Sequence, residues 1–300
     1  MPGYKIGVDG GGSKTECILI DAAGNIRARH LAPGCNPNVV GPEQARHIIA
    51  DALASLLQIA FGDDRETITA THLYMAGNRT FWRDSSLQLA GFGQVITADD
   101  SLPVLELATN GQPGLVLHAG TGSFVAARAP DGSVHYAGGV GWRFGDPGSG
   151  YDLGRRAIGR ALLELQGWAH PSRLGSTVRD HTQLGDTADS GAVTRHFYQH
   201  PEANRHIAAL APALLQLAQE GDPSARELVS ESTGELLAFA TRVATTLFPE
   251  TPLNTLPAGL SGPILTHRVV MEALRSGSSL SLQPVQGTPI EGVRRLLLRA

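Results

Sequence analysis

The alternation of apolar and polar positions in the first 33 residues predicts three short strands joined by two turns. Residues 4–8 alternate and then run apolar, residues 17–20 form a second apolar run, and residues 25–31 form a third. The segments 9–15 and 21–24 separate these runs and are rich in Gly, Asp and Ser, which are turn-forming residues. The pattern therefore favours a three-stranded antiparallel meander.

The same pattern returns in the middle of the chain. An apolar run at 115–118 is followed by a Gly-rich turn at 119–123, a strand at 124–129, a turn at 130–132 and a strand at 133–137. A repeated order of strand, Gly/hydroxyl turn, strand, Gly turn and strand indicates an internal duplication. We expect two similar domains, each of which begins with a meander.

The rest of the chain alternates strands with helices. Apolar residues at helical spacing predict helices over 42–61, 80–89, 102–108, 151–165, 192–199, 203–219, 224–247, 266–274 and 288–299. Further strands are predicted at 72–76, 94–98, 256–260 and 280–282. These elements indicate an α/β protein. We expect an N-terminal domain over 1–108, joined by the closing helix 287–300, and a C-terminal domain with helical insertions over 109–286.

Composition narrows the function classes. The chain has 300 residues, 42% of them hydrophobic, which suffices for two cores. The formal net charge of −4 gives no basic surface for nucleic acid. The two cysteines are too few for a zinc or iron–sulfur site, and no stretch is suited to a membrane span or a signal peptide. We expect a cytoplasmic protein without nucleic-acid or membrane partners. Its oligomeric state stays open, with a homodimer as one option.

Two glycine-rich turns are candidate phosphate-binding loops. In the first, Gly10, Gly11 and Gly12 would let backbone N–H groups approach a phosphate, with Ser13, Lys14 and Thr15 as further donors. Asp9, at the end of the first strand, is placed to hold hydrated Mg²⁺. The second turn, Gly120–Ser123, would clamp the other end of a polyphosphate. A plain β-turn is the alternative for each.

Two further segments are candidate chemical sites. Asp99 and Asp100 follow a strand, where a carboxylate points into the crevice at the sheet edge. Consecutive side chains point to opposite faces, so we expect only one of the two to act as a base. The alternative is a helix cap by Asp100 or Ser101. The segment 138–150 holds six glycines among 13 residues and suits a ligand-contacting loop, although a flexible surface loop would have the same composition.

These motifs together resemble the BadF/BadG/BcrA/BcrD ATPase family. The resemblance rests on Val8–Thr15, Asn36, Ala119–Ser123 and Gly145–Tyr151, in this order along the chain. Within the family, the chain is similar to the N-acetylglucosamine kinase and glucosamine kinase branch. The resemblance implies the actin/hexokinase/Hsp70-like fold, in which two RNase H-like domains flank an interdomain cleft.

The resemblance also implies roles for individual residues. Gly10–Thr15 would form the first phosphate loop with Ser13 on the nucleotide phosphates, and Asp9 would lie near Mg²⁺. Gly120, Thr121 and Gly122 would form the second phosphate loop, and Ser261 and Gly262 would lie on the adenosine side. The sugar contacts would be Asn36, Ser123, Gly139, Val140, Gly141 and Asp146. The catalytic base would be Asp100, or Asp99 if the alignment shifts by one residue.

The resemblance thus predicts an ATP- and Mg²⁺-dependent kinase that phosphorylates the 6-hydroxyl of a small amino sugar, N-acetylglucosamine. Glucosamine kinase is one alternative, and an ATPase that couples its nucleotide state to a protein partner is another. Val140 stands where sugar kinases of this branch often have Trp, and Pro147 replaces a common Glu. Cys17 and Cys35 do not match the cluster cysteines of the related dehydratase activators.

Overall fold

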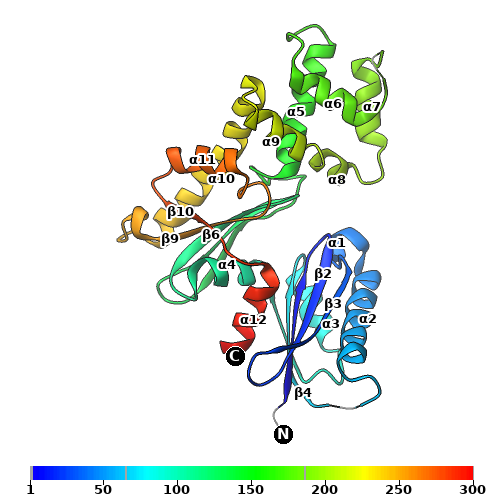
Figure 1. Ribbon diagram of the computed structural model, residues 1–300, viewed down its shortest axis with the longest axis vertical. Coiled ribbons are helices and arrows are strands. Elements are labelled where there is room, and N and C mark those ends of the chain that lie inside the picture. Colours follow the sequence, from blue (N-terminus) through cyan, green and yellow to red (C-terminus); the bar gives the residue numbers. More distant parts are fainter. Residues whose placement is uncertain (1–2, 65, 186, 300) are drawn as a thin grey trace. The chain divides into compact units, whose positions relative to one another are not determined.

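The computed structural model describes residues 3–64, 66–185 and 187–299 (Figure 1). Within it the chain forms two compact units. The first unit contains the chain up to Gly111 together with the segment from Gln286 onward, and the second contains Gln112–Val285. The chain therefore passes from one unit to the other twice.

The first unit is built on a five-stranded sheet. Its strands are β1 (Tyr4–Gly10), β2 (Lys14–Ile20), β3 (Ile26–Pro33), β4 (Ile68–Met75) and β5 (Gln94–Asp99). Their order across the sheet is β3-β2-β1-β4-β5. The first three strands pair antiparallel, as the predicted meander requires, and β4 and β5 continue the sheet in parallel to β1.

Helices cover both faces of this sheet (Figure 1). They are α1 (Pro37–Val40), α2 (Pro42–Phe61), α3 (Arg79–Ser86), α4 (Ser101–Thr109) and α12 (Pro289–Arg299). The apolar side of α2 packs against Val8 and Leu19 on one face. On the other face, α12 packs Val293 and Leu297 against Ile18. Gly7 permits this close approach, since a Cβ there would come within 2.7 Å of side-chain carbons of both Val293 and Leu297.

The second unit repeats the same sheet. Its strands are β6 (Gly114–Ala119), β7 (Ser123–Arg128), β8 (Val134–Gly138), β9 (Pro257–Ser261) and β10 (Ser281–Pro284). Their order is β10-β9-β6-β7-β8, so that β6 to β10 correspond one by one to β1 to β5. Again the first three strands are antiparallel and the last two are parallel to the first. The predicted duplication and the α/β class are confirmed.

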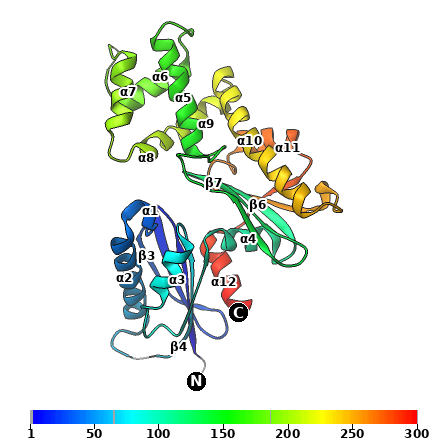
Figure 2. The same ribbon diagram turned by 180° about the vertical axis from the view of Figure 1, so that it is seen from behind.

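The second unit has many more helices (Figure 2). They are α5 (Gly150–Leu165), α6 (Arg173–Thr182), α7 (Ser190–Gln199), α8 (Ala203–Ala208), α9 (Ala211–Gln219), α10 (Pro223–Leu247) and α11 (Arg268–Gly277), with a 3-10 turn at Leu253–Thr255. Helix α10 packs on β6 and β7, while α6, α7 and α8 gather beside α5. No helix among the described residues is both long and apolar enough to cross a bilayer.

Two helix predictions need correction. The single helix expected over 203–219 is divided into α8 and α9, because Pro212 lacks an N–H and stands in the first turn of α9. Helix α6 was not predicted. It begins at a cap in which the Ser172 hydroxyl accepts the N–H of Gly175, and it buries Leu174 and Val178.

Candidate active site

The first glycine-rich turn is fixed by backbone hydrogen bonds on two sides. Gly11 donates its N–H to the carbonyl of Lys14 at 2.9 Å, which closes the turn between β1 and β2. The carbonyl of Gly11 accepts the N–H of Cys35 after β3, and the carbonyl of Gly10 accepts the N–H of Ala76 after β4, at 3.1 and 2.8 Å. Neighbouring segments therefore hold the turn in one conformation.

The second turn is held in the same way. Gly120 donates to the carbonyl of Gly122 at 2.9 Å, and its own carbonyl accepts the N–H of Gly150 at 2.8 Å, at the start of α5. The carbonyl of Ala119 accepts the N–H of Ile264, in the segment after β9, at 3.3 Å. Each bond has its counterpart in the first unit, so the duplication extends to the supports of the two turns.

The three glycines of the first turn are under different structural constraints. A Cβ at Gly10 would lie 2.6 Å from the terminal methyl carbon of Met75, so this residue is small because of packing. A Cβ at Gly12 would meet no heavy atom within 4 Å, and one at Gly11 would meet only the Lys14 carbonyl at 3.4 Å. At these two positions the fold does not exclude a side chain, and an approaching ligand is a sufficient reason for glycine.

Some polar side chains of the first turn lie on the surface, and one is buried. Ser13 and Lys14 are exposed, and the Lys14 ammonium forms a 3.0 Å ion pair with Glu16. Thr15 is fully buried and its hydroxyl donates to the carbonyl of Pro33 at 2.8 Å. That proton ties β2 to β3.

Two carboxyl groups lie at the carboxyl ends of β1 and β5, and the charge of one acts on the other. Burial raises the pKa of Asp9 to about 6, with the charge of Lys14 acting in the opposite direction. Burial, together with the negative charges of Asp99 and Asp9, raises the pKa of Asp100 to about 7. A carboxyl group with a pKa near 7 is suited to accept a proton at neutral pH.

Asp99 and Asp100 differ in their partners, although they are neighbours in the chain. Asp99 binds the guanidinium of Arg79 through its Oδ2, at 2.9 and 3.1 Å, and its Oδ1 accepts the N–H of Ser101. The Asp100 side chain makes no capping hydrogen bond to α4. The helix-start role that was weighed for Asp100 therefore belongs to Asp99.

Asn36 lies beside the first turn. It follows Cys35, which donates to the carbonyl of Gly11, and it forms the N-cap of α1 by accepting the N–H of Asn38 at 3.0 Å. A Cβ at Gly77 would come within 2.6 Å of its Oδ1. The cap uses one lone pair of this oxygen, so Asn36 can offer a ligand its side-chain NH₂ and the second lone pair.

The glycine-rich loop between β8 and α5 turns back onto the second turn. Its Asp146 has a φ of 68° and is only 5% exposed. Burial raises the pKa of this carboxyl group, while backbone hydrogen bonds from Gly141 and Ser123 lower it. A Cβ at Gly122 would lie 2.8 Å from Oδ2 of Asp146, so this carboxyl group lies directly beside the second turn.

Other predicted residues of this loop region have different environments. Ser123 is buried and its hydroxyl donates to the carbonyl of Pro147 at 2.7 Å. Val140 is 58% exposed. Gly139 and Gly141 have φ values of 60° and 88°, which favour glycine. At the end of β9, Ser261 is buried and Gly262 has a φ of 88°.

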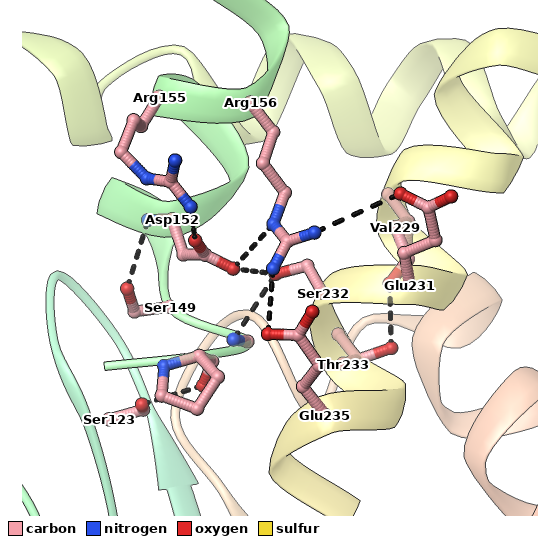
Figure 3. A network of polar contacts seen from close by, with 12 residues as sticks. Ser123, Ser149, Asp152, Arg155, Arg156, Val229, Glu231, Ser232, Thr233 and Glu235 are labelled. Atoms are coloured by element: carbon pink, nitrogen blue, oxygen red, sulfur yellow. Dashed lines mark hydrogen bonds and ion pairs between the residues drawn. The ribbon is translucent and has the colours of Figure 1, made fainter. Parts of the chain in front are cut away.

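A polar network that the sequence did not indicate anchors the end of this loop (Figure 3). Asp152 of α5 binds Arg155 and Arg156 at 2.7 and 2.9 Å and accepts a 2.7 Å hydrogen bond from Ser232 of α10. Ser232 in turn accepts the N–H of Gly148 at 3.1 Å. Although burial raises it, the hydrogen bonds from Ser232 and the two arginines hold the pKa of Asp152 below its usual value. The network therefore fixes a charged group in the interior.

The residues near the first turn can supply only part of the coordination shell of a magnesium ion, and a bound phosphate would have to supply more of it. No group of three or more His, Cys, Asp or Glu residues in the described ranges could hold a metal ion. Mg²⁺ nevertheless commonly uses one or two carboxylates and completes its shell with waters and substrate phosphates. The half-buried Asp9, on the strand that leads into the first turn, matches that donor set.

Two sheets of identical topology, each with a glycine-rich turn between its first two strands, define the actin/hexokinase/Hsp70-like class of folds. A model of the BadF/BadG/BcrA/BcrD ATPase family matches residues 6–277. The chain belongs to this family, as the sequence motifs predict.

Named relatives add detail. The N-acetylmuramic acid/N-acetylglucosamine kinase of Clostridium acetobutylicum is 25% identical over 238 residues, covering 78% of this chain and 76% of the relative. The N-acetyl-D-glucosamine kinase of Dictyostelium discoideum is 25% identical over 244 residues, covering 77% and 76%. These relatives support the expectation of an ATP-dependent carbohydrate kinase.

Solved structures agree with the fold. A Chromobacterium violaceum protein, provisionally assigned as an N-acetylglucosamine kinase, superposes with a TM-score of 0.81 at 29% identity, covering 99% of both chains. A ROK family glucokinase from Streptomyces griseus superposes with a TM-score of 0.56 at 14% identity, covering 98% of this chain and 97% of the glucokinase. The second likeness concerns the fold alone.

Proposed function

We propose that this protein is an ATP-dependent sugar kinase that transfers the γ-phosphoryl group to the 6-hydroxyl of N-acetylglucosamine. The observation that carries the proposal is the environment of Asp100, whose pKa is raised to about 7 beside Asp9 at the end of the sheet that bears the first glycine-rich turn. Phosphoryl transfer to a hydroxyl requires a base close to the bound phosphates, and Asp100 would be that base.

In this proposal Asp100 accepts the proton of the attacking sugar hydroxyl. Its ionised form is the acceptor, and burial keeps its basicity high. Asp99 has a supporting role, because its contacts with Arg79 and with the start of α4 fix the backbone on which Asp100 stands. Phosphoryl transfer is accelerated mainly by positioning and charge stabilisation. A backbone that holds the base in place therefore contributes directly to the rate.

The glycine-rich turns are assigned to the nucleotide. Gly10–Gly12, with Ser13 and Lys14, would receive one part of the triphosphate, and Gly120, Thr121 and Gly122 the other. Ser261 and Gly262 would lie on the adenosine side. Asp9 would hold the hydrated Mg²⁺, which neutralises charge on the phosphates when bound.

The proposal also specifies which sugar accepts the phosphoryl group and which residues bind it. Asn36, Gly139, Val140, Gly141 and Asp146 are assigned to it. The Gly-Gly-Val-Gly run has no charged side chain, so it favours an uncharged acetamido group over the ammonium group of glucosamine. N-acetylmuramic acid is the second candidate acceptor, favoured by the name of the Clostridium relative.

The test is ADP release from ATP and Mg²⁺ with N-acetylglucosamine, N-acetylmuramic acid, glucosamine or glucose, and without sugar. We expect the highest kcat/KM with N-acetylglucosamine, a lower value with glucosamine and a still lower one with glucose. NMR spectroscopy of the product should place the phosphate on O6. ADP release that is independent of any sugar would instead support an ATPase coupled to a protein partner.

A further inference from the structure

His118 connects two segments that are assigned to the nucleotide. It stands near the end of β6, directly opposite Ser261 at the end of the parallel strand β9. Its Nδ1 lies 3.2 Å from the Ser261 hydroxyl oxygen, which is hydrogen-bonding distance. The two side chains thus join strands that are far apart in the sequence, and neither was expected to pair with the other.

The imidazole also adjoins the second glycine-rich turn. Its Nε2 lies 3.7 Å from the position that a Cβ on Gly120 would occupy. On its other side, the ring stacks on Phe124 of β7 with a centroid separation of 4.9 Å and an interplanar angle of 17°. The stacking fixes the plane of the ring, so that one nitrogen faces Ser261 while the other lies near the turn.

His118 is neutral at physiological pH. Burial lowers the pKa of its imidazole to about 4. A neutral imidazole has one N–H donor and one acceptor nitrogen. When Nδ1 is the acceptor nitrogen, the Ser261 hydroxyl donates to it and its direction is fixed; when Nδ1 carries the proton, the bond holds the Ser261 oxygen and leaves its own O–H for another acceptor. In both tautomers the bond holds the Ser261 hydroxyl oxygen in place beside the turn.

We propose that His118 is a positioning residue of the nucleotide site, which orients the Ser261 hydroxyl and holds the end of β9 in register with the second glycine-rich turn for a nucleoside triphosphate. This inference rests on the proposed function, because it takes the second turn as part of the ATP site. It adds a residue to which neither the motifs nor the family resemblance assigns a role.

Three substitutions at one position separate the possible contributions of the ring. His118→Phe keeps a ring that can stack on Phe124 but removes both nitrogens. His118→Asn places a polar atom near the position of Nδ1, whereas His118→Gln places one near Nε2. Ser261→Ala removes the hydroxyl, and the double variant His118→Phe/Ser261→Ala reports whether the two residues act together. His135→Phe, an exposed histidine on β8 of the same sheet, is the matched control.

The measurements are the dissociation constant of a non-hydrolysable ATP analogue, the KM values for ATP and for sugar, and kcat. We expect His118→Phe and Ser261→Ala each to weaken nucleotide binding about three- to tenfold, the range that corresponds to one net hydrogen bond. We expect the double variant to be no weaker than either single variant. His118→Asn should restore most of the affinity, His118→Gln should not, and the sugar KM should stay unchanged.

Other outcomes would overturn the inference. Unchanged nucleotide affinity in His118→Phe, multiplying effects in the double variant, or an equal rise in both KM values would each contradict it, since a general loss of structure affects both substrates. The binding measurement needs no sugar. A wild-type protein that binds the analogue but phosphorylates no sugar would refute the proposed function alone, and one that binds no nucleotide would refute both.

Discussion

At the scale of single residues, Asp99 and Asp100 show how two identical neighbours acquire different properties. Asp99 binds Arg79 and the N–H of Ser101, whereas Asp100 is subject to the charge of the Asp9 carboxyl group. The sequence predicted that only one of the two would serve as a base, but Arg79 stands 20 positions earlier and its partner could not be read from the sequence.

The first prediction separates these two aspartates. We expect Asp100→Asn to lower kcat on the order of 10²- to 10⁴-fold while ATP still binds, because the amide cannot accept the hydroxyl proton. Asp99→Asn, the matched control, should keep more activity, since Asn can still accept the Ser101 N–H. Steady-state kinetics of both variants decides between them. A severe loss in Asp99→Asn with normal Asp100→Asn would place the base one residue earlier.

The second prediction concerns stability and pH. A carboxyl group whose pKa is raised by folding binds its proton more tightly in the folded state, so the free energy of unfolding falls as pH rises from about 4 to about 7. Asp100→Asn removes this penalty. We expect it to be more stable than the wild type by about 1–3 kcal/mol at pH 8 and equally stable near pH 4.

Chemical denaturation at the two pH values measures the difference. Asp131→Asn is the control, because hydrogen bonds from Ser133 lower the pKa of this exposed carboxyl group. It should show no gain at pH 8. A destabilised Asp100→Asn at pH 8 would mean that the Asp100 carboxylate has a stabilising partner when ionised.

At the scale of elements, the third prediction tests the first glycine-rich turn. Gly12→Val places a side chain where the fold leaves space. We expect normal folding and at least tenfold weaker ATP binding, with little change in the sugar KM, because the side chain obstructs the approach of phosphate to the backbone. Gly159→Val, at an unobstructed and exposed position on α5, is the control. Full ATP affinity in a folded Gly12→Val would exclude the turn from the phosphate site.

The fourth prediction concerns the histidines that join α6, α7 and α8. His206 stacks on His181 and His200 with centroid separations of 4.4 and 4.2 Å, and its Nε2 lies 2.8 Å from that of His196. Burial, together with the neighbouring histidines, lowers the pKa of His206 to about 4. Protonation therefore favours the opened state, and stability in this region is lost as pH falls below about 6.5.

We expect hydrogen exchange in α7 and α8 to accelerate between pH 7.5 and pH 5 relative to β6, after correction for the intrinsic pH dependence of exchange. His206→Phe keeps an aromatic ring in the stack but does not titrate, so its acceleration should be smaller. Equal acceleration in the wild type and in this variant would remove His206 as the cause.

Much of the element pattern could be predicted, and the exceptions have physical reasons. The strands, the duplication and most helices follow from local hydrophobic periodicity. Helix α6 has a weak apolar pattern, and its Ser172 cap also bonds to Glu164, so it depends on contacts outside its own sequence. The Asp152–Ser232 pair joins residues 80 positions apart. The buried hydroxyls of Thr15 and Ser123 show the same limit, because burial depends on tertiary contacts.

At the scale of the whole molecule, the two units differ in continuity. The second is one uninterrupted segment, whereas the first needs α12, whose Ile290, Val293 and Leu297 fill one face of its sheet. As a fifth prediction, we expect a fragment of residues 112–285 to fold alone and residues 3–111 to remain unfolded until a peptide of residues 286–299 is added. Circular dichroism and thermal melting test both fragments, and cooperative folding of residues 3–111 alone would contradict it.

The position of α12 also bears on biosynthesis. Because α12 follows the second unit in the chain, the ribosome must add 174 residues between Gly111 and the segment that completes the first sheet. At common elongation rates this takes roughly 10–35 s. During that time the apolar face formed by Ile18, Ile20 and Tyr74 lacks its covering helix. The unit that begins first is therefore completed last, and its apolar face stays exposed on the nascent chain until then.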